Sequence, residues 1–151
     1  MLFRSAFALA PGGIVMRYLL DTNAISEVRK RERGNRGFQN WASSNQPSLW
    51  ALSAVTVGEI RKGIEGRRSA DPVQARNLER WLNGVLAEFA DQFLPVTLAV
   101  AERWGRLAGT LEISDADGLI AATALEHDLT LITRNVSDFA GTGVRVINPW
   151  K

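Results

Sequence analysis

LLDTNAISE (residues 19–27) joins a short apolar run to a helical pattern through one aspartate. The run before it, residues 17–20 (RYLL), is typical of a buried strand, and residues 22–30 are typical of the helix that follows. A strand that passes directly into a helix is the first half of a β–α unit. The pattern therefore predicts that Asp21 lies at the carboxyl end of the first strand.

The same alternation of strands and helices continues along the chain. Further strands are expected at residues 49–53, 93–96, 129–133 and 144–147. Helices are expected at residues 38–44, 54–65 (ended by Gly66), 72–90, 98–111 and 117–127, with a chain break at residues 34–37. This order predicts an α/β fold in three layers, with a central, mostly parallel sheet of about five strands flanked by helices.

The composition places limits on the class of protein. A chain of 151 residues with 46% hydrophobic residues is expected to form one domain with a substantial core. The absence of cysteine excludes disulfides and thiolate metal sites, and it fits a cytoplasmic location. The net charge of +2 is compatible with a nucleic-acid partner. We find no apolar run long enough to span a membrane. Residues 1–15 are interpreted as a poorly ordered leader and residues 16–151 as the domain.

Polar side chains follow several of the expected strands. Asp21 follows the first, Glu59 lies early in the helix after the second, and Asn135 and Asp138 follow the strand at 129–133. Asp117 begins a helix that is expected to start at the same edge. Because ligands bind beyond the carboxyl ends of strands in open α/β sheets, these groups are expected to converge on one site.

Converging carboxylates repel one another unless a cation compensates them. Mg²⁺, or Mn²⁺, suits such a set of oxygen ligands, and near a phosphodiester it activates water and stabilises the leaving oxygen. The chain has one histidine, His127, so a pair of catalytic histidines is impossible. Neither a G-x-G-x-x-G nor a G-x-x-x-x-G-K-[ST] motif follows a strand. The sequence therefore favours a metal-dependent phosphodiesterase.

Each of these residues also has a purely structural interpretation. Asp21 can be a helix N-cap, and Asp138 can cap a short turn. Thr56-x-x-Glu59 and Ser114-x-x-Asp117 resemble capping boxes. The basic residues near Glu59 either form a solvated helix face or bind phosphate; they are Arg61, Lys62, Arg67 and Arg68. His127 is interpreted as a helix-end residue that complements the helix dipole.

Four motifs, in order, resemble those of PIN-domain proteins. They are residues 19–27 (LLDTNAISE), 57–64 (VGEIRKGI), 117–124 (DGLIAATA) and 131–135 (LITRN), with Asp138 and Phe139 after the last. The closing residues 148–150 (NPW) resemble the FitB-like branch of the VapC toxins. The resemblance extends from Met16 to the end of the chain.

The resemblance implies a Mg²⁺-dependent ribonuclease toxin of a type II toxin–antitoxin pair. It implies a homodimer, and an antitoxin whose C-terminal segment covers the site and whose other part binds operator DNA. Asp21, Glu59 and Asp117 correspond to the metal-binding carboxylates. The fourth position departs from the strictest pattern, because Asn135 stands where some members have Asp. Asp138, one helical turn further on, is a possible substitute.

Three functions are weighed from the residues and the resemblance. In the first, Mg²⁺ and Glu59 or Asp138 position water for hydrolysis of an RNA phosphodiester, and Thr22, Asn23 and Thr133 orient the site. In the second, the chain is an antitoxin-binding co-repressor with little or no nuclease activity. A phosphatase with an Asp nucleophile would need Asp-x-Asp after the first strand, which this sequence lacks. The RNA that would be cut is left open.

Overall fold

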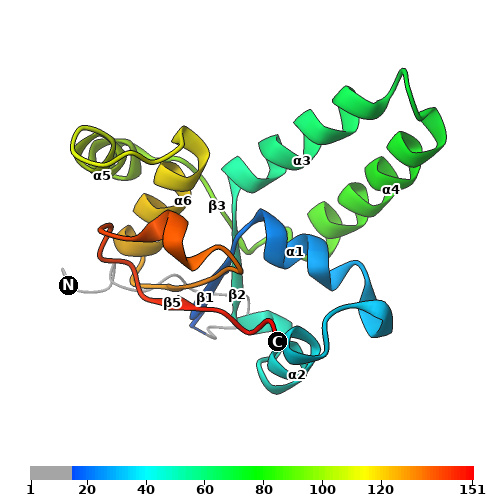
Figure 1. Ribbon diagram of the computed structural model, residues 1–151, viewed down its shortest axis with the longest axis horizontal. Coiled ribbons are helices and arrows are strands. Elements are labelled where there is room, and N and C mark those ends of the chain that lie inside the picture. The colour runs from blue at the N-terminus through cyan, green and yellow to red at the C-terminus, as the bar shows by residue number, and fades with distance from the viewer. Residues whose placement is uncertain (1–14) are drawn as a thin grey trace.

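The computed structural model describes residues 15–151. Its centre is a five-stranded parallel sheet with the strand order β3-β2-β1-β4-β5 (Figure 1). The strands are β1 (Tyr18–Leu20), β2 (Trp50–Ser53), β3 (Phe93–Leu94), β4 (Thr130–Ile132) and β5 (Val146–Ile147). The predicted α/β architecture is confirmed. The order of the strands reverses between β1 and β4, and this is where open α/β sheets bind ligands.

Six helices enclose the sheet. They are α1 (Thr22–Val28), α2 (Arg36–Ser44), α3 (Ala54–Arg67), α4 (Pro72–Glu88), α5 (Leu98–Ala108) and α6 (Asp115–Glu126). Helices α5 and α6 lie on one side of the sheet, while α1, α2 and α4 lie on the other (Figure 1). Helices α3 and α4 form a hairpin that projects from the sheet and has its own apolar contact around Ile64, Ala75 and Leu82.

The central strands are apolar on both faces, and successive side chains enter different cores. Leu19, Ala51 and Leu131 enter the core beneath α6, and Leu20, Leu52 and Ile132 enter the core beneath α1, α2 and α4. Helix α6 contributes Ala121 and Ala124, whose small side chains let it approach the sheet closely. The sheet therefore holds the starts of α1, α3 and α6 in fixed positions.

Several predicted boundaries were wrong. Gly66 does not end its helix, because α3 continues to Arg67. The predicted break at residues 34–37 is too long, because the side chain of Asn35 accepts a hydrogen bond from Phe38 N and caps α2 from Arg36 onward. Short 3-10 helices at Arg31–Arg33, Pro47–Leu49 and Val136–Phe139 were not predicted. The third strand stops at Leu94, because the following Pro95 lacks an N–H for the ladder.

Two interpretations from the sequence can be compared with the structure. Arg61 and Arg68 both pair with Glu79, at 2.6 and 3.2 Å, and Arg68 also pairs with Glu65 at 2.7 Å, which favours the solvated helix face over phosphate binding for these two residues. His127 is the C-cap residue of α6, as the helix-end interpretation predicted, and burial lowers its pKa, which weakens any charge interaction with the helix dipole.

The leader predicted at residues 1–15 lies outside the described residues except for Val15, so it stays a prediction. Met16, the first residue of the predicted domain, is buried at 2% exposure beneath the sheet. Among the described residues, no helix combines the length and the hydrophobicity that crossing a membrane requires.

Candidate active site

Asp21 occupies the end of β1, beside the point where the strand order reverses. Its backbone N–H donates to Ile132 O on β4, and its Oδ1 accepts from Ala24 N at 2.8 Å. It is therefore a helix N-cap, as one structural interpretation proposed. The cap uses one carboxylate oxygen, and the side chain is only 5% exposed. Capping does not require burial of a charge, so it does not explain the position fully.

Glu59 reaches the same edge from α3. Its Oε1 accepts a short hydrogen bond from Thr22 Oγ1 at the start of α1, and Thr22 Oγ1 also lies 3.5 Å from the buried Thr56 Oγ1. The capping-box interpretation of Thr56 and Glu59 is wrong, because Ser53 caps α3 and Thr56 lies inside its first turn. Glu59 is instead oriented by a residue of another helix.

Asp117 lies in the first turn of α6, half-buried. Ser114 Oγ caps this helix by accepting from Asp117 N at 3.1 Å, so half of the predicted capping box is present. Gly118 follows, and a Cβ there would lie 2.8 Å from Trp104 Cδ1 on α5. This close contact between α5 and α6 fixes the turn that carries Asp117.

The fourth group lies between β4 and the 3-10 helix Val136–Phe139. The buried Thr133 hydroxyl accepts from Asn135 N at 3.0 Å and hydrogen-bonds to the Asp21 carboxyl group. Asn135 is half-buried, and its side chain makes no capping hydrogen bond. Asp138 is exposed and lies close enough to Asp117 that its charge raises the pKa of Asp117. Asp117 and Asp138 line one shallow groove together with Ser114 and Ser137.

The carboxylates repel one another electrostatically. Burial raises the pKa of Asp21, and the charge of Asp117 adds to this; hydrogen bonds from Thr133, Ala24 and Asn23 act in the opposite direction without cancelling it. Burial also raises the pKa of Asp117, and the charges of Asp138 and Glu59 add to it. Within residues 15–151, none of these four carboxylates forms an ion pair.

This donor set fits a hard divalent cation, since it offers only oxygen ligands and an uncompensated negative charge. In the described part of the chain, however, no three acidic or histidine side chains converge closely enough to coordinate one ion directly. Mg²⁺ usually takes one or two carboxylates and keeps several waters, so water can bridge the remaining carboxylates. The arrangement is therefore suited to a hydrated cation rather than to a closed cage.

A second groove lies along α1, and two of its lining residues are sequence neighbours of site residues. Asn23, one residue after Thr22, lines it together with Arg134, which directly follows Thr133. The Arg134 guanidinium lies 5.8 Å from the ring centroid of Trp150, close to the C-terminus. The contact of Arg134 with Trp150 joins separate segments of the chain, so no local sequence pattern predicts it. The expected orienting role of Asn23 stays a prediction.

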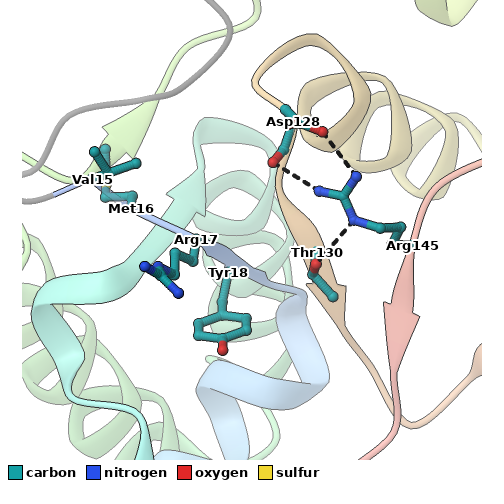
Figure 2. Close-up of a pocket in the computed structure, with 7 residues that line it drawn as sticks. All are labelled: Val15, Met16, Arg17, Tyr18, Asp128, Thr130 and Arg145. Carbon is teal, nitrogen blue, oxygen red and sulfur yellow. Dashed lines mark hydrogen bonds and ion pairs between the residues drawn. The ribbon is translucent and has the colours of Figure 1, made fainter.

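The opposite edge of the sheet has a pocket of different character (Figure 2). It is formed around the beginnings of β1 and β4 by Val15, Met16, Arg17, Tyr18, Asp128, Thr130 and Arg145. Its one carboxylate, that of Asp128, pairs with Arg145 at 2.9 Å, and Arg145 also donates to Thr130 Oγ1 and to Asp128 O. The pocket contains none of the predicted site residues, and its one carboxylate is paired with an arginine.

Known proteins resemble this chain over nearly its whole length. The model of the PIN domain family matches residues 18–143. The chain is 36% identical to the VapC ribonuclease Y4jK of Sinorhizobium fredii, covering 88% of this chain and 97% of that protein. It is also 36% identical to the toxin FitB of Neisseria gonorrhoeae, covering 87% and 97%. A solved structure of FitAB bound to a DNA fragment matches with a TM-score of 0.74 at 34% identity, covering 89% and 96%.

The fold, the site and this match define the class: the chain belongs to the PIN domain family. Within that family it is similar over nearly its whole length to VapC- and FitB-type toxins. The family and the fold predicted from the four motifs are therefore confirmed.

Proposed function

We propose that this protein is the toxin of a type II toxin–antitoxin pair and that it hydrolyses RNA phosphodiester bonds with a divalent cation. One observation carries the proposal. Asp21, Glu59 and Asp117 come from three different elements and lie at one sheet edge, and no basic side chain of the described residues pairs with them. The ribonuclease name of Y4jK supports RNA as the substrate.

Asp21, Glu59 and Asp117 would hold the cation, directly or through bridging water. When bound, a Mg²⁺ or Mn²⁺ ion polarises the phosphate and activates water. Thr22 orients Glu59 by donating a hydrogen bond to one of its carboxylate oxygens. Thr133 orients Asp21, and its hydroxyl also accepts from the Asn135 backbone N–H, which holds the segment leading to Asp138. Asp138 is exposed beside Asp117 and forms no ion pair in the described chain. Of Asn135 and Asp138, it is therefore the better placed to accept a proton from water.

We propose an antitoxin as the protein partner, because the solved FitAB complex holds a toxin of this type together with FitA on DNA. Operator DNA would then be contacted only through the antitoxin. The predicted homodimer, the cytoplasmic location and the choice of Mg²⁺ over Mn²⁺ belong to the same proposal.

The alternative function is a co-repressor that binds its antitoxin and has little or no nuclease activity. One observation favours it: Asn135 adds no charge at the fourth position. The amide of asparagine can hydrogen-bond a metal-bound water, but it does not supply the negative charge of a carboxylate ligand. Asp138 would then be the only acidic group on that side of the site.

Incubation of the purified, antitoxin-free protein with total RNA separates the two functions. The reactions contain Mg²⁺, Mn²⁺ or EDTA, and they are repeated with Asp21→Asn, whose amide oxygen can still cap α1. The proposal expects cleavage that both EDTA and the substitution abolish. Cleavage that survives either one contradicts the metal mechanism. Absence of cleavage by protein shown to be folded and to bind the metal favours the co-repressor.

A further inference from the structure

The groove along α1 is lined by an arginine whose side chain has neither an ion pair nor a hydrogen bond within residues 15–151. It is lined by Asn23, Ser26, Glu27, Lys30, Arg134 and Trp150. Its two basic residues differ in their environment. Lys30 pairs with Glu27 at 3.0 Å, whereas the side chain of Arg134 makes no ion pair or hydrogen bond within residues 15–151. The Arg134 guanidinium is directed to the ring of Trp150.

The aromatic support under Arg134 is held firmly. Trp150 packs against Phe38 of α2 with the ring centroids 4.8 Å apart. The residue after it is clipped to the start of α2, where the Asn35 side chain donates to Lys151 O at 2.6 Å and accepts from Lys151 N at 3.1 Å. Figure 1 shows this end of the chain beside α2.

The sequence of α2 is adapted to this docking. Gly37 lies so close to Pro149 O that any Cβ there would overlap the carbonyl oxygen. Asn35 also donates its backbone N–H to the buried Glu27 at 2.6 Å. One asparagine therefore links α1, α2 and the C-terminal segment, and through Trp150 this linkage determines where the Arg134 guanidinium lies.

We propose that Arg134, supported by Trp150, binds a phosphate of the RNA strand next to the phosphodiester that is cleaved. The inference rests on the proposed function, since it assumes that the cleaved phosphate lies at the carboxylates. A strand held there must continue over the adjacent surface, and this groove offers an exposed guanidinium on the residue directly after Thr133, which contacts the buried Asp21. A guanidinium binds phosphate oxygens with two parallel N–H groups, and stacking on an indole preorganises it. Trp150 and Asn35 are then positioning residues.

RNA binding in a series of salt concentrations tests the proposal. The probe is a fluorescein-labelled single-stranded RNA in Ca²⁺ buffer, followed by anisotropy, with its integrity checked by gel afterwards. Arg134→Gln should weaken binding roughly tenfold, as expected for a hydrogen bond to a charged group. It should also lower the slope of log K against log salt by about 0.7, the value for one phosphate contact on a single strand.

The control is Arg106→Gln. Arg106 is an exposed arginine on α5, and its guanidinium likewise has no ion pair or hydrogen bond in the described chain. It should leave both the affinity and the slope unchanged. Trp150→Leu should weaken RNA binding, whereas Trp150→Phe keeps an aromatic face and should retain most of the affinity for RNA. A residue that only stabilises the fold would change the melting temperature without changing the salt slope.

Three results would overturn the inference. The first is a salt slope of Arg134→Gln equal to that of the parent protein, and the second is absence of RNA binding by the parent. The third is an Arg134→Gln variant that loses antitoxin binding but keeps RNA binding, which would mean that the guanidinium binds an acidic peptide. Cleavage of total RNA by the parent protein in Mg²⁺ is measured separately. If cleavage occurs, only the role of Arg134 fails; if it does not, the proposed function fails as well.

Discussion

The two ends of helix α6 carry aspartates in opposite situations. Asp117, in the first turn, faces Glu59 and Asp138, and burial and these charges raise its pKa. Asp128, just beyond the last turn, is paired with Arg145 at 2.9 Å in the pocket of Figure 2. The helix therefore joins an edge of the sheet where negative charge accumulates to an edge where it is neutralised.

This difference separates a binding site from an ordinary surface. An exposed ion pair such as that of Asp128 contributes little to stability and needs no further partner. Carboxylates that repel one another in a partly buried position destabilise the fold until a cation binds, and such perturbed groups gather at functional sites. The charge balance of the lining residues is therefore what distinguishes one edge of the sheet from the other.

The largest expected effect comes from removing one charge at each end of α6. Asp117→Asn should lower the rate of RNA cleavage by more than about 100-fold, or roughly 2.7 kcal/mol, because a metal-binding carboxylate is lost. Asp128→Asn should leave the rate unchanged. Cleavage of a labelled RNA under single-turnover conditions measures both. Equal losses in the two variants would contradict the assignment of the site to the carboxyl edge.

The next effect concerns metal binding by the folded chain. A cation that binds only the native state at about 100 times its Kd adds roughly 2.7 kcal/mol, which corresponds to a rise in Tm of about 5–10 °C for a chain of this length. Mg²⁺ should therefore raise the Tm of the parent protein and of Asp128→Asn, but not that of Asp117→Asn. A rise of equal size in all three would place the cation elsewhere.

The same carboxylates give the metal-free protein a defined pH dependence. The pKa values of Asp21 and Asp117 are higher in the folded chain than the usual 3.8, so the native state binds more protons than the unfolded state. Their contribution to stability is therefore complete below pH 3.8 and is lost as the pH rises through the raised values. Glu27 acts in the opposite sense, because its pKa is lowered through hydrogen bonds from Asn35 and Lys30 that outweigh its burial.

The substitution Asp21→Asn separates the contribution of Asp21 to the pH dependence of stability from that of Glu27. Between pH 4 and neutrality, Asp21→Asn in EDTA should lose less stability than the parent, as measured by urea unfolding. Mg²⁺ should stabilise the parent more as the pH rises, because ionised carboxylates bind the cation. Parallel stability curves for the parent and the variant would show that Asp21 titrates normally.

A smaller effect is expected from disturbing only the end of α6 that carries Asp117. In Gly118→Ala the new methyl group would lie 2.8 Å from Trp104 Cδ1, so α6 or the indole must move, at a cost of roughly 1–3 kcal/mol. Cleavage should fall together with stability. Gly84→Ala on α4 is the control, because nothing lies within 4 Å of its Cβ, and it should stabilise by about 0.5–1 kcal/mol. A fully active, stable Gly118→Ala would contradict this tight packing.

The sequence predicted the carboxyl edge better than its surroundings, and the reason is physical. Asp21 and Asp117 follow local patterns, a strand end and a capped helix start, and parallel strands bring such ends together. The contact of Arg134 with Trp150 depends on how the C-terminus docks on Asn35, which no short-range pattern encodes. The 3-10 helix Arg31–Arg33 was also missed, and the Asn35 N–H just beyond it donates to Glu27 of α1, a contact that helix propensity does not encode.

The smallest expected effect is on the stability of the neutralised edge. Asp128 has a positive φ of 54°, a conformation that asparagine adopts readily, so Asp128→Asn changes the charge without straining the backbone. The loss of its exposed pair with Arg145 should cost less than about 1 kcal/mol. Urea unfolding should detect the loss at low salt and not at about 1 M salt, where the pair is screened. A loss of several kcal/mol that persists at high salt would mean that the Asp128–Arg145 pair is important for the stability of the fold. The two ends of α6 would then differ in more than whether their aspartates are paired with a positive charge.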